Sequence, residues 1–126
     1  MLTPNPTHPF DLSVTRVLAA PRSLIWRAWT EPELLKRWFT PRPWTTPVVE
    51  LDVRPGGSSR IVMRGPDGEE HDNLGVYLEV VKDQRLVFTD AFTGAWIPSA
   101  KPFMTGVVTL ADEAGGTRYT AMARHW

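Results

Sequence analysis

The chain has 126 residues, of which 42% are hydrophobic and 22% charged, and its 14 lysines and arginines equal its 14 acidic residues in number. This length and composition predict one globular domain, and the lack of excess positive charge argues against nucleic-acid and membrane-surface binding. Cysteine is absent, as is any apolar run of about 20 residues, which excludes a disulfide framework and a membrane-spanning helix. We therefore expect a cytoplasmic protein.

The first half of the chain combines a tail, a strand and two helices. Residues 1–10 contain three prolines among small polar residues, and we expect a flexible tail there. Even spacing of apolar residues in 11–19 predicts a first strand, so the single domain spans 11–126. Residues 21–39 predict two amphipathic helices of about nine residues each.

Each helix has one apolar face. The residues are Leu24, Ile25, Ala28 and Trp29 in the first, and Leu34, Leu35, Trp38 and Phe39 in the second. Thr30 and Glu33 have the spacing of a capping box that separates the two helices. Because helices this short are not stable alone in water, both must dock on the rest of the protein.

The remainder of the chain reads as strands joined by short turns. Alternating apolar residues predict six strands, at 48–53, 59–64, 71–81, 85–92, 102–111 and 117–126. In the strand 71–81 we expect one side to carry Leu74, Val76, Leu78 and Val80. This order of elements predicts an α+β fold with a curved antiparallel sheet, whose apolar face two short helices cannot cover. Either that face surrounds a cavity or something else packs against it.

The order of elements and four motifs resemble the START-like (SRPBCC) superfamily, which includes the birch-pollen allergen type and polyketide cyclases. The motifs are WTEPELLKRWF (29–39), RPGG (54–57), GVYLEVVKDQRLVFTDAF (75–92) and GGTRYTAMARHW (115–126). The chain is most similar to the branch named after an activator of the heat-shock-protein-90 ATPase.

The resemblance implies a helix-grip fold, in which the curved sheet holds a long C-terminal helix and a hydrophobic cavity lies between sheet and helices. The given sequence stops at Trp126, where that helix would begin, so we expect a helix grip that lacks it. We expect a large open groove in its place, or a second copy of the chain covering the exposed sheet face in a homodimer.

Aromatic and methionine residues are the candidate lining of the cavity. With one acidic residue among them, they are Trp29, Trp38, Phe39, Met63, Tyr77, Phe88, Asp90, Phe103, Met104 and Tyr119. Each alone is an ordinary core residue, but together with the fold they predict a hydrophobic ligand pocket, in which flexible methionines adapt to the ligand. The two tyrosine hydroxyls either orient the ligand or bond to the backbone at the rim of the sheet.

Two residues are candidates for acid or base chemistry. Asp90 alternates with Leu86 and Phe88, which directs its carboxylate into the cavity. Alternatively, a bulge or strand end turns Asp90 to solvent or pairs it with an arginine such as Arg64. His125 shares one side of the last strand with small alanines, which leave room for a ligand, and it is a candidate general base. Alternatively, it is an ordinary half-exposed histidine near a chain end. The histidines lack metal-ligand spacing, and we expect no metal and no cofactor.

These observations favour a protein that binds a hydrophobic small molecule, either a lipid or an aromatic, polyketide-like compound. One alternative is an enzyme of the cyclase or dehydratase kind that uses Asp90 or His125 with a tyrosine. Another, implied by the name of the similar branch, is an interaction domain that stimulates a heat-shock ATPase. The residues favour a binding protein over an enzyme.

Overall fold

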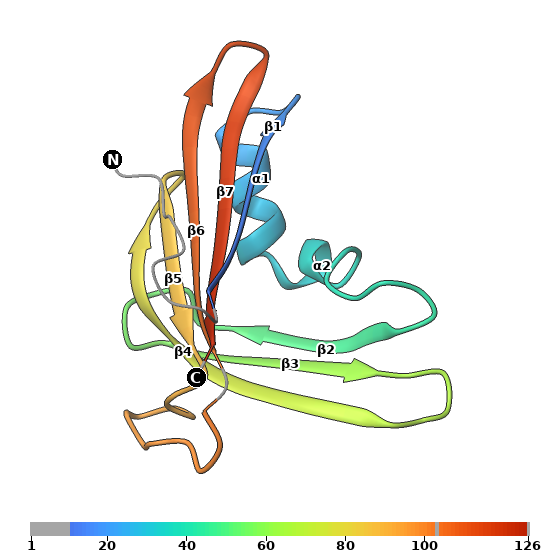
Figure 1. The fold of residues 1–126 in the computed structure, drawn as a ribbon. Coiled ribbons are helices and arrows are strands. Elements are labelled where there is room, and N and C mark those ends of the chain that lie inside the picture. The colour runs from blue at the N-terminus through green and yellow to red at the C-terminus, as the bar shows by residue number, and fades with distance from the viewer. Residues whose placement is uncertain (1–10, 103, 126) are drawn as a thin grey trace.

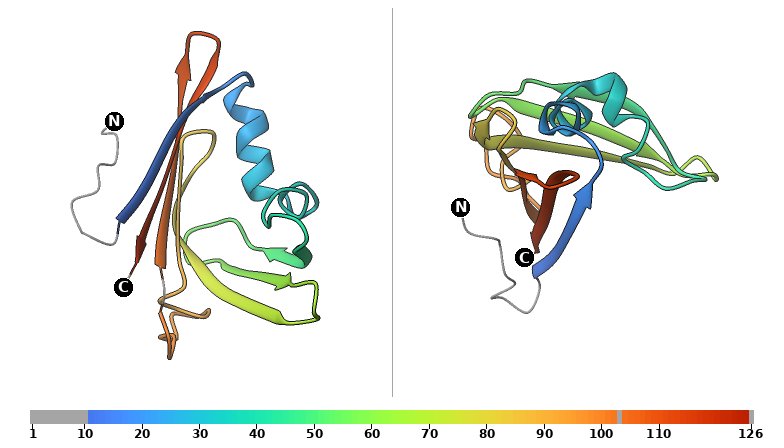
Figure 2. Two further views of the ribbon diagram at one scale, coloured as in Figure 1. Left: turned by 45° about the vertical axis from the view of Figure 1, so that its right-hand side comes forward. Right: turned by 90° about the horizontal axis from the view of Figure 1, so that it is seen from above.

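The computed structural model describes residues 11–102 and 104–125, so the expected tail lies outside the described residues. Its elements in chain order are β1 (Asp11–Leu18), α1 (Arg22–Thr30), α2 (Pro32–Leu35), β2 (Thr45–Leu51), β3 (Ser58–Arg64), β4 (Glu70–Val81), β5 (Arg85–Thr89), β6 (Met104–Glu113) and β7 (Gly116–His125). The strands form one antiparallel sheet in the order β1-β7-β6-β5-β4-β3-β2, with both helices on the same side (Figures 1 and 2). This confirms the α+β helix-grip fold, and the described residues contain no long C-terminal helix.

The sheet bends sharply, so that β2 and β3 run nearly crosswise to β6 and β7 (Figure 1). The long strand β4 continues around this bend, and its pairing with β5 shifts between Tyr77 and Glu79. A bulge of this kind bends a strand and increases its twist. It gives the sheet the curvature that leaves a concave side beneath the helices.

The bulge also changes which residues of β4 face the helices. Tyr77 belongs to the core cluster beneath α1, and Val80, three residues later, packs against the same cluster. The expectation that Leu74, Val76, Leu78 and Val80 share one side is therefore wrong. Before the bulge, the side of β4 that faces the helices carries the odd-numbered residues instead.

Helix α1 is attached to the sheet by Ile25 and Trp26, both 8% exposed. They pack on a cluster from three strands, consisting of Tyr77, Leu86, Val108 and Leu110. Leu24, expected on the buried face, is 48% exposed, because the buried stripe is rotated by about one residue toward Trp26. The helix ends before Pro32, because a proline disfavours the helical conformation in the residue that precedes it. That residue, Glu31, is extended at φ −102° and ψ 119°.

Helix α2 is shorter than the sequence predicts. Only Pro32–Leu35 is α-helical, and single turns then lead to Phe39, whose N–H donates to the carbonyl of Leu35 at 3.1 Å. The predicted capping box is wrong, because the Thr30 hydroxyl donates to the carbonyl of Trp26 at 2.8 Å instead. Leu35, 2% exposed, anchors this segment.

The contrast between neighbouring residues of α1 can be tested by alanine substitution. We expect Ile25→Ala to lower the free energy of unfolding by about 3 kcal/mol, because it opens a cavity between helix and sheet. Leu24→Ala, one residue away, should change it by less than about 0.5 kcal/mol. Urea unfolding followed by tryptophan fluorescence measures both, and equal effects would contradict this placement of the helix.

Candidate functional site

The helices cover only part of the concave side of the sheet, which we call the inner face. On the covered part, Leu86 of β5 is the cross-strand partner of Val108 of β6, and both pack under α1. Two residues further along β5, Phe88 pairs with Gly106. Because successive side chains of a strand point to opposite faces, this pair also lies on the inner face. The hollows of the uncovered part begin here.

The central groove is a hollow of about 290 Å³ between the segment after α2 and strands β3 to β6. Its apolar walls are Phe39, Ile61, Met63, Phe88 and Met104. Two further hollows adjoin it at Phe88. One of about 50 Å³ leads inward to Trp29 and Tyr77, and one of about 230 Å³ extends over the inner face of β1 and β7. The three together form a continuous apolar depression.

Two glycines on the inner face leave room for the groove. A Cβ atom at Gly106 would collide with the ring of Phe88, so only glycine allows that ring to lie across β6. A Cβ atom at Gly75 would lie 2.6 Å from the carbonyl oxygen of Thr89 on the neighbouring strand. Both positions are thus restricted to glycine by the close approach of a neighbour.

An aromatic cluster closes the inner end of the groove. The ring of Trp29 lies 4.7 Å from Trp38 and 5.8 Å from Phe88, measured between centroids. The indole N–H of Trp38 donates to the carbonyl of Ala28 at 3.0 Å, which ties the segment after α2 to α1. Tyr119 makes a side-chain hydrogen bond with Trp29. The cluster therefore has fixed positions before any ligand is present.

Both tyrosines of the predicted site are neutral phenols, Tyr77 buried and Tyr119 half-buried. Burial raises the pKa of Tyr77, and the negative charge of Asp52 adds to the increase. Burial likewise raises the pKa of Tyr119, although the hydrogen bond with Trp29 opposes the shift. The two hydroxyls therefore keep their protons throughout the physiological pH range.

The structure brings together seven of the ten residues predicted to line the cavity. The central groove contains Phe39, Met63, Phe88, Asp90 and Met104, and the hollow beside it adds Trp29 and Tyr77. Trp38 and Tyr119 instead support the site from behind through their contacts with Trp29. Phe103 and the side chain of His125 lie outside the described residues, and only the backbone of His125 is placed, as the partner of Met104.

Asp90 lies at the edge of the groove, but its carboxylate is engaged by the backbone. Its Oδ1 accepts a hydrogen bond from the N–H of Met104 at 2.9 Å, and its own N–H donates to the carbonyl of Met104 at 3.2 Å. These bonds hold together the ends of β5 and β6. The alternative pairing with Arg64 is wrong, because Arg64 forms an ion pair with Glu70 at 2.6 Å.

Sequence reasoning missed two polar residues on the inner face of β4, of which Asn73 lines the groove and His71 a polar hollow next to it. His71 and Asn73 are the partners of Met63 and Ile61, and they share the inner face with Gly75 and Tyr77. Counting backward from Tyr77 in steps of two would have found them. The even-numbered apolar residues of the same strand concealed this row.

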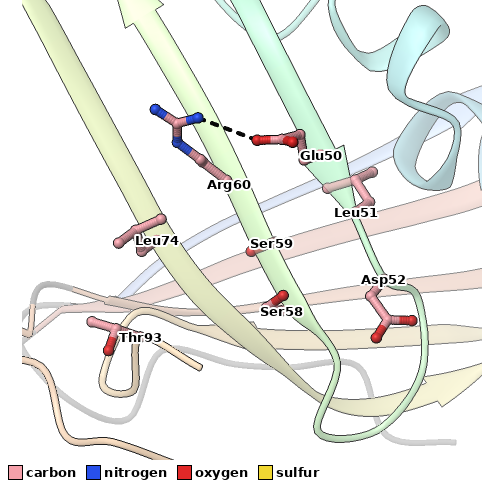
Figure 3. A pocket seen from close by; sticks show the side chains of 8 residues that line it. All are labelled: Glu50, Leu51, Asp52, Ser58, Ser59, Arg60, Leu74 and Thr93. Atoms are coloured by element: carbon pink, nitrogen blue, oxygen red, sulfur yellow. Dashed lines mark hydrogen bonds and ion pairs between the residues drawn. The ribbon is translucent and has the colours of Figure 1, made fainter. Parts of the chain in front are cut away.

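A larger hollow, of about 370 Å³, lies over β2 and β3 but has the character of solvated surface (Figure 3). Its charged groups are already paired: Glu50 with Arg60 at 3.2 Å, and Asp52 with Arg54 at 2.9 Å. Within residues 11–102 and 104–125, no group of three acidic, histidine or cysteine side chains could hold a metal ion. No helix in this part is long and apolar enough to cross a membrane.

The fold and its open groove define a START-like protein, and the comparisons agree. Residues 19–126 match the family described as activator of Hsp90 ATPase homolog 1-like protein. The solved structure of a Nitrosomonas europaea protein is 44% identical, with a TM-score of 0.88 over 93% of this chain and 75% of that one. A Mycobacterium smegmatis protein is 30% identical, with a TM-score of 0.75 over 92% and 72%.

An AHSA1-like protein from Aeromonas hydrophila, 23% identical with a TM-score of 0.74 over 90% and 74% of the two chains, shares the fold. No curated protein matches the sequence significantly. Because the family match spans most of the residues, this chain belongs to the activator of Hsp90 ATPase homolog 1-like family.

The dependence of the groove on Gly106 predicts a non-additive pair of substitutions. Gly106→Ala should lower the free energy of unfolding by about 1–3 kcal/mol, because the new methyl group displaces the Phe88 ring. In a Phe88→Ala background the same change should cost nothing, since no ring remains to collide. Urea unfolding of the two single variants and the double variant measures this coupling. Additive effects would contradict the proposed collision.

The homodimer expected from the sequence stays a prediction. Leu12 lies on the inner face of β1 and is 63% exposed, whereas Val17 lies on the opposite face and is 56% exposed. If a second copy covers the inner face, Leu12→Arg should shift the protein to a monomer, and Val17→Arg should not. Light scattering over a range of concentrations measures the mass, and a monomeric wild type would contradict the prediction.

Proposed function

We propose that this protein binds a hydrophobic small molecule, a lipid or an aromatic, polyketide-like compound, in the central groove. The fold and family support a ligand-binding or a co-chaperone-like domain, and the groove favours the first. The observation that carries the proposal is the apolar depression itself, because exposed apolar hollows of this size commonly mark binding sites. A ligand would remove Phe39, Phe88 and Met104 from water.

The walls suit a flat or flexible hydrophobic guest. Phe39 and Phe88 present ring surfaces, and the unbranched side chains of Met63 and Met104 adjust to different shapes. The polar atoms nearest the groove are mostly engaged already, as the bonds between Asp90 and Met104 show. This arrangement favours binding over acid or base catalysis, because the groove offers shape and apolar area rather than an unengaged carboxylate.

A neutral fluorescent probe, N-phenyl-1-naphthylamine, tests the proposal. We expect its fluorescence to rise on binding to the wild-type protein, and we expect Ile61→Trp to weaken binding at least tenfold, because the larger ring fills the groove. Val81→Trp is the matched control, since Val81 is exposed and lines none of the hollows described above. Absence of binding to the wild type, or equal binding by both variants, would contradict the proposal.

A further inference from the structure

The central groove does not end in apolar surface but opens into a polar hollow of about 500 Å³, which we call the mouth. The two hollows share Asn73, Leu74 and Asp90. The mouth is also lined by three further residues of β4 and by three residues of the segment between β5 and β6, namely Glu70, His71, Asp72, Thr93, Ser99 and Lys101. A ligand lying in the groove would therefore have one apolar end and one end among polar side chains.

The acidic groups of the mouth are already engaged. Glu70 pairs with Arg64 at 2.6 Å, and Asp72 pairs with Arg60 at 3.0 Å. The carboxylate of Asp90 accepts the N–H of Met104. These bonds use part of the acceptor capacity of each carboxylate.

Two side-chain donors of the mouth, those of Lys101 and His71, have no such partners among the described residues, whereas the Asn73 amide already donates to the carbonyl of Ile61 at 3.2 Å. The ammonium group of Lys101 forms no ion pair within the described part of the chain, and only its backbone N–H is bound, to Ser99 at 3.2 Å. His71 stacks on Trp44, with ring centroids 5.7 Å apart, and among the described residues its ring nitrogens make no hydrogen bond. The stack fixes the plane of the imidazole while its nitrogens stay available.

We propose that the ligand is an amphiphile that carries a carboxylate, and that Lys101 and His71 bind this carboxylate at the mouth. This inference rests on the proposed function, because the groove must first hold the apolar body. An ammonium group and an imidazole that line one hollow supply donors that a carboxylate can accept. The bond between the ammonium group and the carboxylate is charge-assisted and therefore stronger than a neutral hydrogen bond. Arg60 and Arg64 offset the charges of Asp72 and Glu70, and the charge of Lys101 offsets that of Asp90, so the two donors rather than a net positive charge would hold the anion.

The spacing along β4 sets the length of the ligand. Gly75, Asn73 and His71 lie in one row on the inner face, and four residues of strand span about 13 Å. A body over Gly75 therefore places its polar end near His71 when it is about as long as two fused rings with a carboxylate. A short acyl chain would reach the same point.

The test compares two competitors of the same shape, 2-naphthoate and the neutral 2-naphthamide, as displacers of N-phenyl-1-naphthylamine. With the wild type at low salt, we expect 2-naphthoate to bind about fivefold more tightly, as a partly exposed ion pair allows. High salt should remove most of this preference. Lys101→Gln and His71→Gln should each reduce it, and Lys82→Gln, which changes an exposed lysine in the β4–β5 turn, should leave it unchanged.

The outcomes separate this inference from the proposed function. If the probe binds but the two competitors bind equally, or the preference for 2-naphthoate is the same in Lys101→Gln and His71→Gln as in the wild type, the carboxylate proposal is overturned and the hydrophobic groove stands. If the probe and both competitors fail to bind the wild type, both proposals fail. Where the wild type does prefer 2-naphthoate, replacing this competitor with decanoate shows whether the bound body is flat or flexible.

Discussion

The packing of α1 on the sheet is the contact on which the rest of the structure depends. Ile25 and Trp26 are the buried residues of that helix, and they fix it over β5 and β6 near Leu86 and Leu110. The helical pair is short, so one end of the inner face is sealed and the other is open. The apolar depression along Phe88 is the part of the concave face that these helices do not reach.

The same strands that form this depression also give it direction. The inner row of β4 changes from Tyr77, which is buried, to Asn73 and His71, which are exposed. Across from this row, Asp90 is engaged with the backbone of β6, whereas Lys101 keeps its ammonium group available. An apolar inner end and a polar outer end are what an amphiphilic ligand requires, and this gradient is a more specific feature of the chain than its overall fold.

The sequence predicted the elements better than it predicted their faces. The order of the elements along the chain and the presence of two helices follow from periodicity and turns, because these patterns are local. The pairing of β1 with β7 was not predicted. The prediction of which residues of β4 face the helices was wrong for the part before the bulge. One extra residue in a strand exchanges the two faces of all residues on its other side. The length of the second helix was overestimated, because residues 34–39 keep helical spacing but form only turns after Leu35.

By itself, the sequence determined the class of fold, and it pointed to five of the residues that line the central groove, namely Phe39, Met63, Phe88, Asp90 and Met104. Hydrophobic alternation and the motifs shared with the family require no knowledge of distant contacts. Only the tertiary structure decided that Asp90 bonds to Met104 rather than to Arg64, that Gly106 makes room for Phe88, and that His71 lies at the mouth. Each of these depends on strand register, which is set by pairing between residues far apart in the chain and is not visible in local patterns.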